Sequence, residues 1–515
     1  MRAPLIAVTI TLIASSLTAP TALAELKLPA VISDGMVLQR DMRVPIWGTA
    51  DPGQQVTVTV RDQRVSATAG ADGRWVAKLK PLKAGGPFSM TVTGGNTITV
   101  SDVLAGDVWV CSGQSNMAFA LRSTTNAQQD IAEADHPRIR LFKVKNVVGD
   151  KPLDDTEATW QACAPETARA FSAVGYFFGR DLHKELQVPI GLIGTYWGGT
   201  PAEAWTSRAT LEANPELHAP LERWDAVLAN YPKAKANYDQ RLAQWQENAP
   251  KLRAEGKPVP RKPRPPSGPG SPHTPGGLYN GMIAPLIPYA IKGAIWYQGE
   301  SNAGRAYQYR KIFPAMIRDW RRHWGQGAFP FMWVQLPNFR AYKAIPGDSD
   351  WAELREAQLV TLSLPNTAMA IIIELGEAND IHPKNKAPVG RRLALAALGT
   401  VYGQDVVHSG PIYKSMTVEG HRARLSFEHI GGGLAARDCE RLKGFTVAGP
   451  DRTFYHASAQ IDGDTVVVSS AAVRNPVAVR YAWADNPVCN LYNAAGLPAS
   501  PFRTDDWRGI TAGKR

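Results

Sequence analysis

The spacing of apolar and polar positions divides the chain into three stretches. In residues 25–104, short apolar runs are separated by turn-forming segments, and residues 56–60 alternate apolar and polar at period two. Short strands at close spacing predict a small β-sandwich domain there. Strand-like runs with turn signals return from about residue 405, which predicts a β-rich C-terminal region over 405–515.

Residues 105–404 show a different pattern, in which apolar strand-like runs alternate with helical periodicity. Expected strands cover 108–112, 188–194, 290–297, 331–336 and 368–375, and expected helices cover 171–186, 307–324, 351–362 and 389–402. This alternation predicts an α/β domain built on a parallel, doubly wound sheet. Residues 213–275 depart from the pattern. They have helical composition to about 248 and are then rich in Pro, Lys and Arg, which indicates an excursion from the core.

The N-terminus has the features of a targeting segment. Arg2 is followed by a short apolar run over residues 5–17 and by Ala22-Leu23-Ala24, a small-x-small cleavage site. We therefore expect residues 1–24 to be a cleaved signal peptide and the mature protein to be secreted or periplasmic. No later stretch is long and apolar enough to predict membrane insertion.

Charge and cysteine content limit the kinds of partner, metal and disulfide that we expect. The formal net charge is +11, but much of the excess lies in residues 233–264, and no nucleic-acid-binding motif accompanies it. We expect no nucleic-acid partner. No Cys or His cluster predicts a metal site, and we expect no cofactor. The four cysteines allow three full pairings in an exported chain, of which we favour Cys439–Cys489 because both lie in the C-terminal region.

Polar clusters follow four of the predicted strands, over residues 113–116, 194–200, 298–302 and 377–382. Parallel strands place their carboxyl ends at one edge of the sheet, where ligands bind in open α/β folds. The four clusters are therefore expected to line a single crevice.

Two of these clusters carry the residue types of nucleophilic catalysis. Ser115 follows a buried strand and a Gly turn, and a hydroxyl nucleophile needs a base such as His382. Asp380, two residues before that His, is close enough to orient its ring, although an Asx-turn is the structural alternative. Met117 interrupts the Gly-x-Ser-x-Gly elbow, so the pattern indicates a serine hydrolase outside the ordinary α/β-hydrolases.

Taken together, these segments resemble the sialate O-acetylesterase family within the SGNH hydrolase superfamily. The resemblance rests on residues 36–40, 113–117, 171–174, 194–201, 296–302 and 380–383 and covers most of the mature chain. It implies a flavodoxin-like three-layer sandwich and metal-free removal of acetyl groups from sugars. It also implies Ser115 as nucleophile, His382 as base and Asp380 as the residue that orients the base.

The same resemblance implies which groups stabilise the oxyanion or bind substrate. Candidate donors are the Ser115 amide, a backbone amide near Gly194 or Gly198, and the side chain of Gln298. Asn302, from the same strand-end cluster, is a further substrate-binding candidate, as is Glu300.

One departure from the superfamily pattern concerns the acid. That pattern places Asp three residues before the His, where this chain has Asn379. The acid member is therefore Asp380 or, as the alternative, Glu300.

The function predicted from these residues is an exported serine esterase that removes O-acetyl groups from oligosaccharides or sialic acid. One alternative is an acetylesterase acting on hemicellulose such as xylan or xyloglucan, which lacks the carboxylate of a sialate that Arg305 is a candidate to bind. The other is a non-catalytic sugar-binding protein, for which the flanking β regions and 15 Trp residues would be suitable. The oligomeric state stays open.

Overall fold

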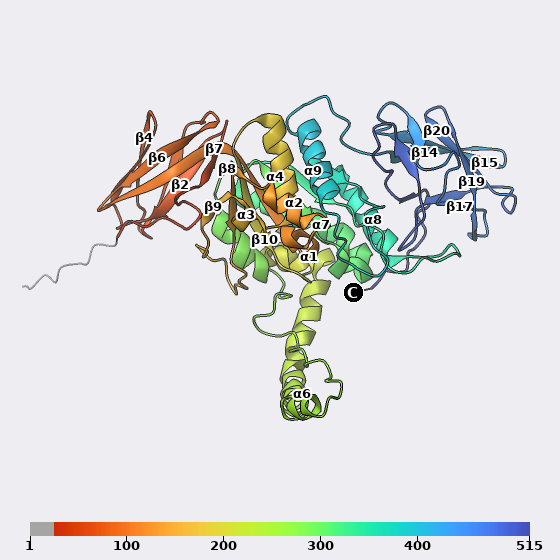
Figure 1. The fold of residues 1–515 in the computed structure, drawn as a ribbon, viewed down its shortest axis with the longest axis horizontal. Coiled ribbons are helices and arrows are strands. Elements are labelled where there is room, and N and C mark those ends of the chain that lie inside the picture. The colour runs from red at the N-terminus through yellow and green to blue at the C-terminus, as the bar shows by residue number, and fades with distance from the viewer. Residues whose placement is uncertain (1–24, 515) are drawn as a thin grey trace, which may run out of the picture.

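The structure, a computed structural model, describes residues 25–514 and consists of three parts in a row. An N-terminal β part and a C-terminal β part flank a central α/β part, and helix α6 projects from the centre (Figure 1). The predicted signal peptide, residues 1–24, lies outside the described residues. In the described range, no helix has both the length and the apolar character needed to cross a membrane.

The central part is a sheet with the strand order β13-β12-β11-β7-β10-β8-β9. All neighbouring pairs are parallel except β8 with β9. These strands are β7 (Thr97–Gly113), β8 (His136–Lys143), β9 (Trp160–Cys163), β10 (Ile190–Tyr196), β11 (Gly293–Tyr297), β12 (Phe331–Val334) and β13 (Thr367–Ala370). The predicted α/β class with a parallel sheet is confirmed.

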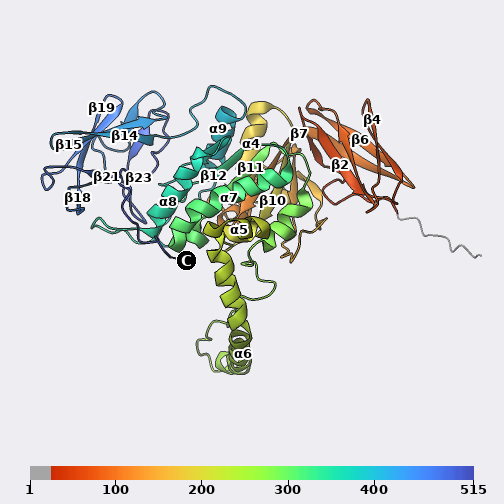
Figure 2. The ribbon, with the colours of Figure 1, turned by 180° about the vertical axis from the view of Figure 1, so that it is seen from behind.

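Helices cover both faces of this sheet. On one face, α4 (Ala173–Leu186) packs against α9 (Ala387–Thr400). On the other, α7 (Ala306–Trp324) packs against α8 (Asp350–Val360), as the view from behind in Figure 2 shows. The short helices are α1 (Ser115–Ala118), α2 (Ala127–Ala132), α3 (Pro165–Ala168) and α5 (Arg208–Ala213). The resulting three layers are those of the flavodoxin-like arrangement.

Strand β7 connects the N-terminal and central parts without a break. Its first half pairs with β6 (Gly85–Thr93) and β1 (Val37–Gln39), and its second half pairs with β10 and β11. Residues 103–113 are all buried, because both faces of the strand are covered there. The predicted division near residue 104 thus falls inside one continuous strand, and the domain boundaries themselves stay predictions.

The N-terminal part contains β2 (Val44–Thr49), β3 (Gln55–Val60), β4 (Gln63–Thr68) and β5 (Arg74–Leu79) in addition to β1 and β6. Val56, Val58 and Val60 are buried while their neighbours are more exposed, as the alternation in this run predicted. Sequence patterning missed β4, since none of its residues is fully buried.

The C-terminal part has a hydrophobic core of its own. One sheet contains β14 (Ile412–Glu419), β15 (Arg422–Glu428), β19 (Ser458–Asp462) and β20 (Thr465–Ser469). A second contains β17 (Phe445–Ala448), β18 (Phe454–His456), β21 (Ala478–Tyr481) and β23 (Phe502–Arg503), and β16 (Leu434–Ala436) pairs with β22 (Leu491–Asn493).

The favoured disulfide Cys439–Cys489 is absent, and all four cysteines are free. Cys439 is exposed, with its Sγ 3.2 Å from the Arg441 carbonyl oxygen. The Cys489 thiol instead lies beside Tyr481, where burial raises its pKa to about 12. Proximity in sequence was therefore a poor guide, because one thiol faces solvent and the other faces the interior.

The excursion forms a helix that ends a few residues later than the sequence predicted. Helix α6 (Ala219–Ala254) extends past residue 248 and contains Pro232 and Pro250. Its few buried residues, Pro220, Leu221 and Trp224, lie at its root, apart from Ala249 near its far end. Within the described residues, it is therefore the root of α6 that packs firmly against the central part.

Candidate active site

Ser115 lies at the first position of α1, two residues beyond the end of β7. The turn needs glycine at position 113, which has φ of +139°, and a Cβ there would lie 2.2 Å from the Tyr297 carbonyl oxygen. The Gln114 amide donates to that same oxygen at 3.0 Å. The close approach of β7 and β11 thus fixes the backbone that presents Ser115.

His382 lies opposite this serine, in the loop that follows β13. Its Nε2 is 2.8 Å from Ser115 Oγ, the separation expected of a nucleophile and its base. Burial lowers the pKa of His382 below its ordinary value of 6.5, Asp380 opposes this change, and the cation of Lys386 adds to it. The ring is therefore neutral near pH 7 and can accept the hydroxyl proton.

Asp380 is the carboxylate beside His382. Its Oδ1 is 3.6 Å from His382 Nδ1 and accepts a hydrogen bond from the His382 amide at 2.9 Å. The second contact is that of an Asx-turn. The same carboxylate therefore forms the turn and lies beside the His382 ring, so the two interpretations of Asp380 are compatible. Glu300, the alternative acid, instead directs its Oε1 to Asn116 Nδ2 at 2.5 Å.

The loop after β10 covers Ser115 from another side. A Cβ placed on Gly198 would lie 3.3 Å from Ser115 Cβ, so this backbone passes directly over the serine. The Trp197 amide donates to the Gly113 carbonyl at 3.1 Å, and His273 Nε2 is 3.0 Å from the Gly199 carbonyl oxygen. Strand β7 and the excursion therefore both hold this loop in place.

Gln298 and Asn302, which follow β11, hold the same loop by hydrogen bonds. Gln298 Nε2 donates to the Thr200 carbonyl at 3.2 Å and to Asn302 Oδ1 at 2.7 Å. Asn302 Oδ1 also accepts from the Ala202 amide at 3.0 Å. Both side chains are fully buried, and among their hydrogen bonds in the described chain none is to Ser115. We infer that they position the loop, whereas an oxyanion donor would have to face the serine.

Sequence reasoning missed Lys386, which lies at the start of α9 and has no exposed surface. Its Nζ donates to Asn116 Oδ1 at 2.5 Å and lies 4.9 Å and 5.2 Å from the ring centroids of Phe119 and Tyr297. Burial lowers the pKa of its amine from 10.5 to about 7, and nearby carboxylates, Glu300 first, oppose that change. The sequence gives no signal of this burial, because Lys386 lies in a polar segment where a lysine is expected to be exposed.

Asn116, the second missed residue, joins three of the four strand-end clusters. Its Nδ2 donates to Glu300 Oε1 at 2.5 Å and to the Ile381 carbonyl at 2.9 Å. Glu300 Oε2 is buried and has no hydrogen-bond partner in the described chain, and burial raises the pKa of this carboxyl. The amide of Asn116 therefore ties helix α1, which carries Ser115, to the segment that carries His382.

A cavity of about 400 Å³ lies beside these residues, lined by Gly199, Ser301, Arg305 and the root of α6. Arg305 Nη2 makes long contacts within the described chain, 3.6 Å to Glu203 Oε1 and 3.4 Å to the Ser301 carbonyl oxygen. Arg223 Nη2 lies at 2.8 Å from the same Glu203 oxygen and already neutralises that carboxylate. Of the two arginines that line this cavity, Arg305 is therefore the one less engaged by Glu203 and better placed to meet a ligand.

Comparison with known proteins gives one consistent result. The family model described as carbohydrate esterase, sialic acid-specific acetylesterase, matches residues 105–245 and 273–399. Sialate O-acetylesterase of Mus musculus is 31% identical over 92% of this chain and 93% of its own, and that of Homo sapiens is 30% identical over 92% and 91%. The crystal structure of a carbohydrate acetylesterase from Xanthomonas citri has 40% identity and a TM-score of 0.80, covering 94% of this chain and all of that one.

The fold and these relatives define the class as a carboxylic ester hydrolase, a carbohydrate O-acetylesterase. Within that class, the chain belongs to the sialic acid-specific acetylesterase family of carbohydrate esterases.

Proposed function

We propose that this protein is an exported serine esterase that removes O-acetyl groups from sialic acids and sialylated oligosaccharides. The 2.8 Å contact between Ser115 Oγ and His382 Nε2 is the observation that carries the proposed chemistry. The matches to mammalian sialate O-acetylesterases support the choice of leaving group.

The proposed reaction is acyl transfer through Ser115. Its Oγ forms a bond to the acetyl carbonyl carbon while His382 Nε2 takes the hydroxyl proton. The backbone amides of Ser115 and Gly198 are the proposed donors to the oxyanion. As the ester bond breaks, His382 returns the proton to the departing sugar oxygen. Water then repeats the sequence on the acetyl-serine and releases acetate.

Asp380 completes the proposed catalytic triad. A carboxylate near Nδ1 stabilises the imidazolium that forms when the proton is taken. Its position, 3.6 Å from Nδ1, favours it over Glu300, whose Oε1 is occupied by Asn116. Substrate binding can tighten that distance, since catalytic contacts are often long in free enzymes.

Arg305 is the proposed recognition residue for the sialate carboxylate. A guanidinium binds a carboxylate with two parallel hydrogen bonds, and this one is poorly engaged and opens into the cavity beside Ser301. Arg305→Gln should therefore reduce activity on acetylated sialosides and leave activity on neutral acetylated sugars unchanged. Acetylated xylan or xyloglucan oligosaccharides are the neutral comparison.

The test is acetate release from a panel of O-acetylated sialosides and hemicellulose oligosaccharides, with Ser115→Ala as the blank. Activity on sialosides that depends on Ser115 supports the proposal. Exclusive activity on hemicellulose would replace the substrate but keep the chemistry. A protein that hydrolyses none of them and resists a serine-directed fluorophosphonate would be a sugar-binding protein instead.

Export is the remaining element of the proposal and rests on the sequence of residues 1–24. We propose cleavage after Ala24 and a secreted or periplasmic mature protein. N-terminal sequencing of the protein recovered outside the cytoplasm should begin at Glu25. An intact N-terminus on protein that stays in the cytoplasm would contradict this element alone.

A further inference from the structure

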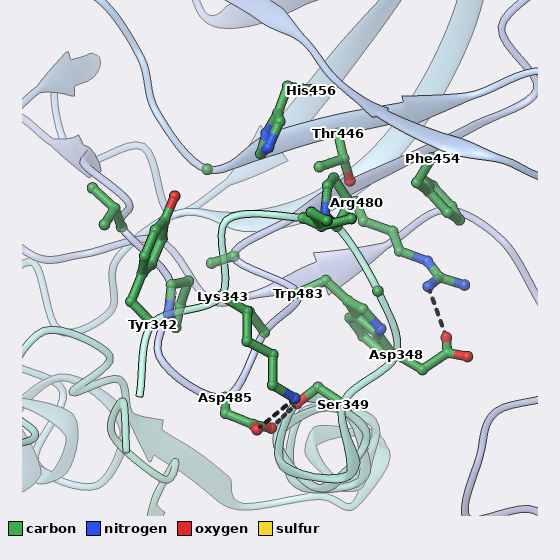
Figure 3. A pocket seen from close by; sticks show the side chains of 18 of the residues that line it. Tyr342, Lys343, Asp348, Ser349, Thr446, Phe454, His456, Arg480, Trp483 and Asp485 are labelled. Carbon is green, nitrogen blue, oxygen red and sulfur yellow. Dashed lines mark hydrogen bonds and ion pairs between the residues drawn. The ribbon is translucent and has the colours of Figure 1, made fainter. Parts of the chain in front are cut away.

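A second cavity, of about 380 Å³, lies at the junction of the catalytic and C-terminal parts. One wall is the segment 340–349 between β12 and α8, which we call the arch, and the other consists of β17, β18, β21 and the residues after β21. In Figure 3, Tyr342, Lys343 and Asp348 come from the arch, and Thr446, Phe454 and His456 come from the strands. This volume lies within the range of small-molecule sites, which occur preferentially between domains.

The arch is held by hydrogen bonds, and the cavity lies between it and the C-terminal strands. His456 Nε2 is 2.7 Å from the Ala344 carbonyl oxygen, in the middle of the arch. Ser349 Oγ donates to Asp485 Oδ1 at 2.5 Å where the arch enters α8. The wall of the cavity that the arch forms is thus held in place by hydrogen bonds at the middle and at the end of the arch.

The walls combine apolar surface with hydrogen-bonding groups. Ile345 is 83% exposed and Tyr342 57% exposed, both on the arch, and Val488 across from them is also exposed. Trp483 also lines the cavity, but Arg480 and Arg503 lie over its ring, so Tyr342 is the exposed apolar ring of the lining. Exposed apolar side chains that gather at one pocket indicate a binding surface. Single exposed apolar residues, in contrast, are scattered over most proteins and indicate nothing.

The charges around the cavity are largely paired with one another. Lys343 Nζ lies 3.5 Å from Asp485, and Asp348 lies 3.4 Å from Arg480. Lys443 is the further cation of the lining, and it is exposed to solvent. The cavity therefore favours a neutral ligand that offers both an apolar face and hydroxyl groups. A pyranose ring has this chemistry, since its C–H faces pack on aromatic rings and its hydroxyls reach polar edges.

The position of the cavity relates it to the active site. The arch follows β12, so it leaves the sheet at the same edge as the segments carrying Ser115 and His382. Asn338, just before the arch, accepts a hydrogen bond from the Gly376 amide at 2.7 Å and donates to Asn486 at 2.8 Å. The first contact reaches the loop of the base, and the second reaches a neighbour of the cavity lining.

We propose that this cavity is a second carbohydrate-binding site, which holds neutral pyranose units of the glycan that carries the acetyl group. The identity of the ligand rests on the proposed function, whereas the existence of the site does not. Because the arch leaves the sheet at the edge that carries Ser115 and His382, we expect binding here to add affinity for chains and none for a small acetyl ester.

The direct test is calorimetric titration of the full-length Ser115→Ala protein with cellohexaose, xylohexaose and 3′-sialyllactose. Comparing the three separates hemicellulose-type from sialylated chains as the source of the pyranose units. Tyr342→Ala removes an exposed ring and should weaken binding about tenfold, the order expected for one lost aromatic contact. Tyr455→Ala is the matched control, because Tyr455 is exposed on β18 but does not line the cavity. Thr446→Trp, which fills the cavity, is a second and independent variant.

A kinetic measurement separates this inference from the proposed function. With Ser115 intact, Tyr342→Ala should raise KM for the acetylated form of the oligosaccharide that binds and leave kcat and KM for p-nitrophenyl acetate unchanged. Oligosaccharide binding that Tyr342→Ala and Thr446→Trp both weaken supports the site even if no ester is hydrolysed. Active enzyme that binds none of the three oligosaccharides, or binds them equally well in both variants, would overturn it.

Discussion

Replacing Lys386 with Met tests whether a buried cation holds the catalytic residues in register. The change keeps the length of the side chain and removes Nζ, which donates to Asn116 Oδ1 at 2.5 Å. Asn116 in turn holds the Ile381 carbonyl, one residue before His382, at 2.9 Å. We expect kcat to fall although the side chain touches neither Ser115 nor the substrate.

The size of the loss follows from the hydrogen bond that disappears. A hydrogen bond to a charged group contributes about 1.5–3 kcal/mol, and each 1.4 kcal/mol is a factor of ten in rate. If most of that energy restrains Asn116, kcat should fall about 10- to 100-fold. KM for a small ester should change little, because the side chain of Lys386 is fully buried.

Whereas Lys386→Met should lower the activity, it should raise the stability of the folded protein. Lowering the pKa of Lys386 from 10.5 to about 7 corresponds to about 5 kcal/mol against folding while the amine is charged. That cost is complete below pH 7 and disappears as the pH rises toward 10.5, since only the unfolded state binds the proton in that window. Met removes the cost, although Glu300 loses a nearby cation, so about 5 kcal/mol is an upper bound on the gain.

The assay combines kinetics with thermal melts. Lys386→Met should melt no lower than the parent at pH 6, and any gain should shrink toward pH 10. Because the Lys386 charge lowers the pKa of His382, its loss should also move the acid limb of the kcat/KM profile to higher pH. Lys384→Met, an exposed lysine two residues earlier, is the matched control and should change neither property.

The positioning argument is refuted if folded Lys386→Met keeps the parent kcat and acid limb. It is also refuted if the control Lys384→Met loses as much activity, because the loss would then come from a general change of charge. A slower rate of fluorophosphonate labelling at Ser115, with an unchanged melting temperature, would localise the defect to the nucleophile and its base.

Three other results are expected. The parent kcat/KM should fall on the acid side with a midpoint below 6.5, because burial holds the pKa of His382 below that value and the protonated ring cannot act as base. Asp380→Asn should reduce kcat by about 10²- to 10⁴-fold and move that midpoint lower, whereas Glu300→Gln should leave the midpoint closer to the parent value; the reverse order would exchange the two carboxylates. Gly198→Ala should lower kcat more than about tenfold with a small change in melting temperature, since the added methyl crowds Ser115 at 3.3 Å and can displace an oxyanion donor.

Much of this arrangement was predictable because it depends on local periodicity and one topological rule. The apolar run before Ser115 is buried on both faces, as the pattern of a central parallel strand requires. Parallel strands then bring the segments after β7 and β13 to one edge, which is why residues 267 positions apart in the chain meet at 2.8 Å.

The remainder depended on the direction in which side chains point. Lys386 reads as an exposed lysine, and its burial becomes apparent only when α1, β11 and α9 are assembled around it. Gln298 carries the donors an oxyanion site needs, but its side-chain Nε2 donates to the loop after β10 and to Asn302. The continuous strand β7 likewise has no signal in the sequence, since an apolar run does not reveal where its pairing partners change.

Two sets of segments with different roles leave the carboxyl edge of the sheet. Those after β7 and β13 supply Ser115 and His382, which meet directly. Those after β10, β11 and β12 supply the root of α6, Arg305 and the arch, which line two cavities and leave the Ser–His contact to the other set. Because these segments share an edge but do not carry Ser115 or His382, we predict that changes in them alter which sugar is bound without disturbing the proposed acyl transfer. Gly198 is the exception, since its loop both covers Ser115 and leads into the excursion. Alterations of α6 that reach its root should therefore affect the rate as well as the choice of substrate.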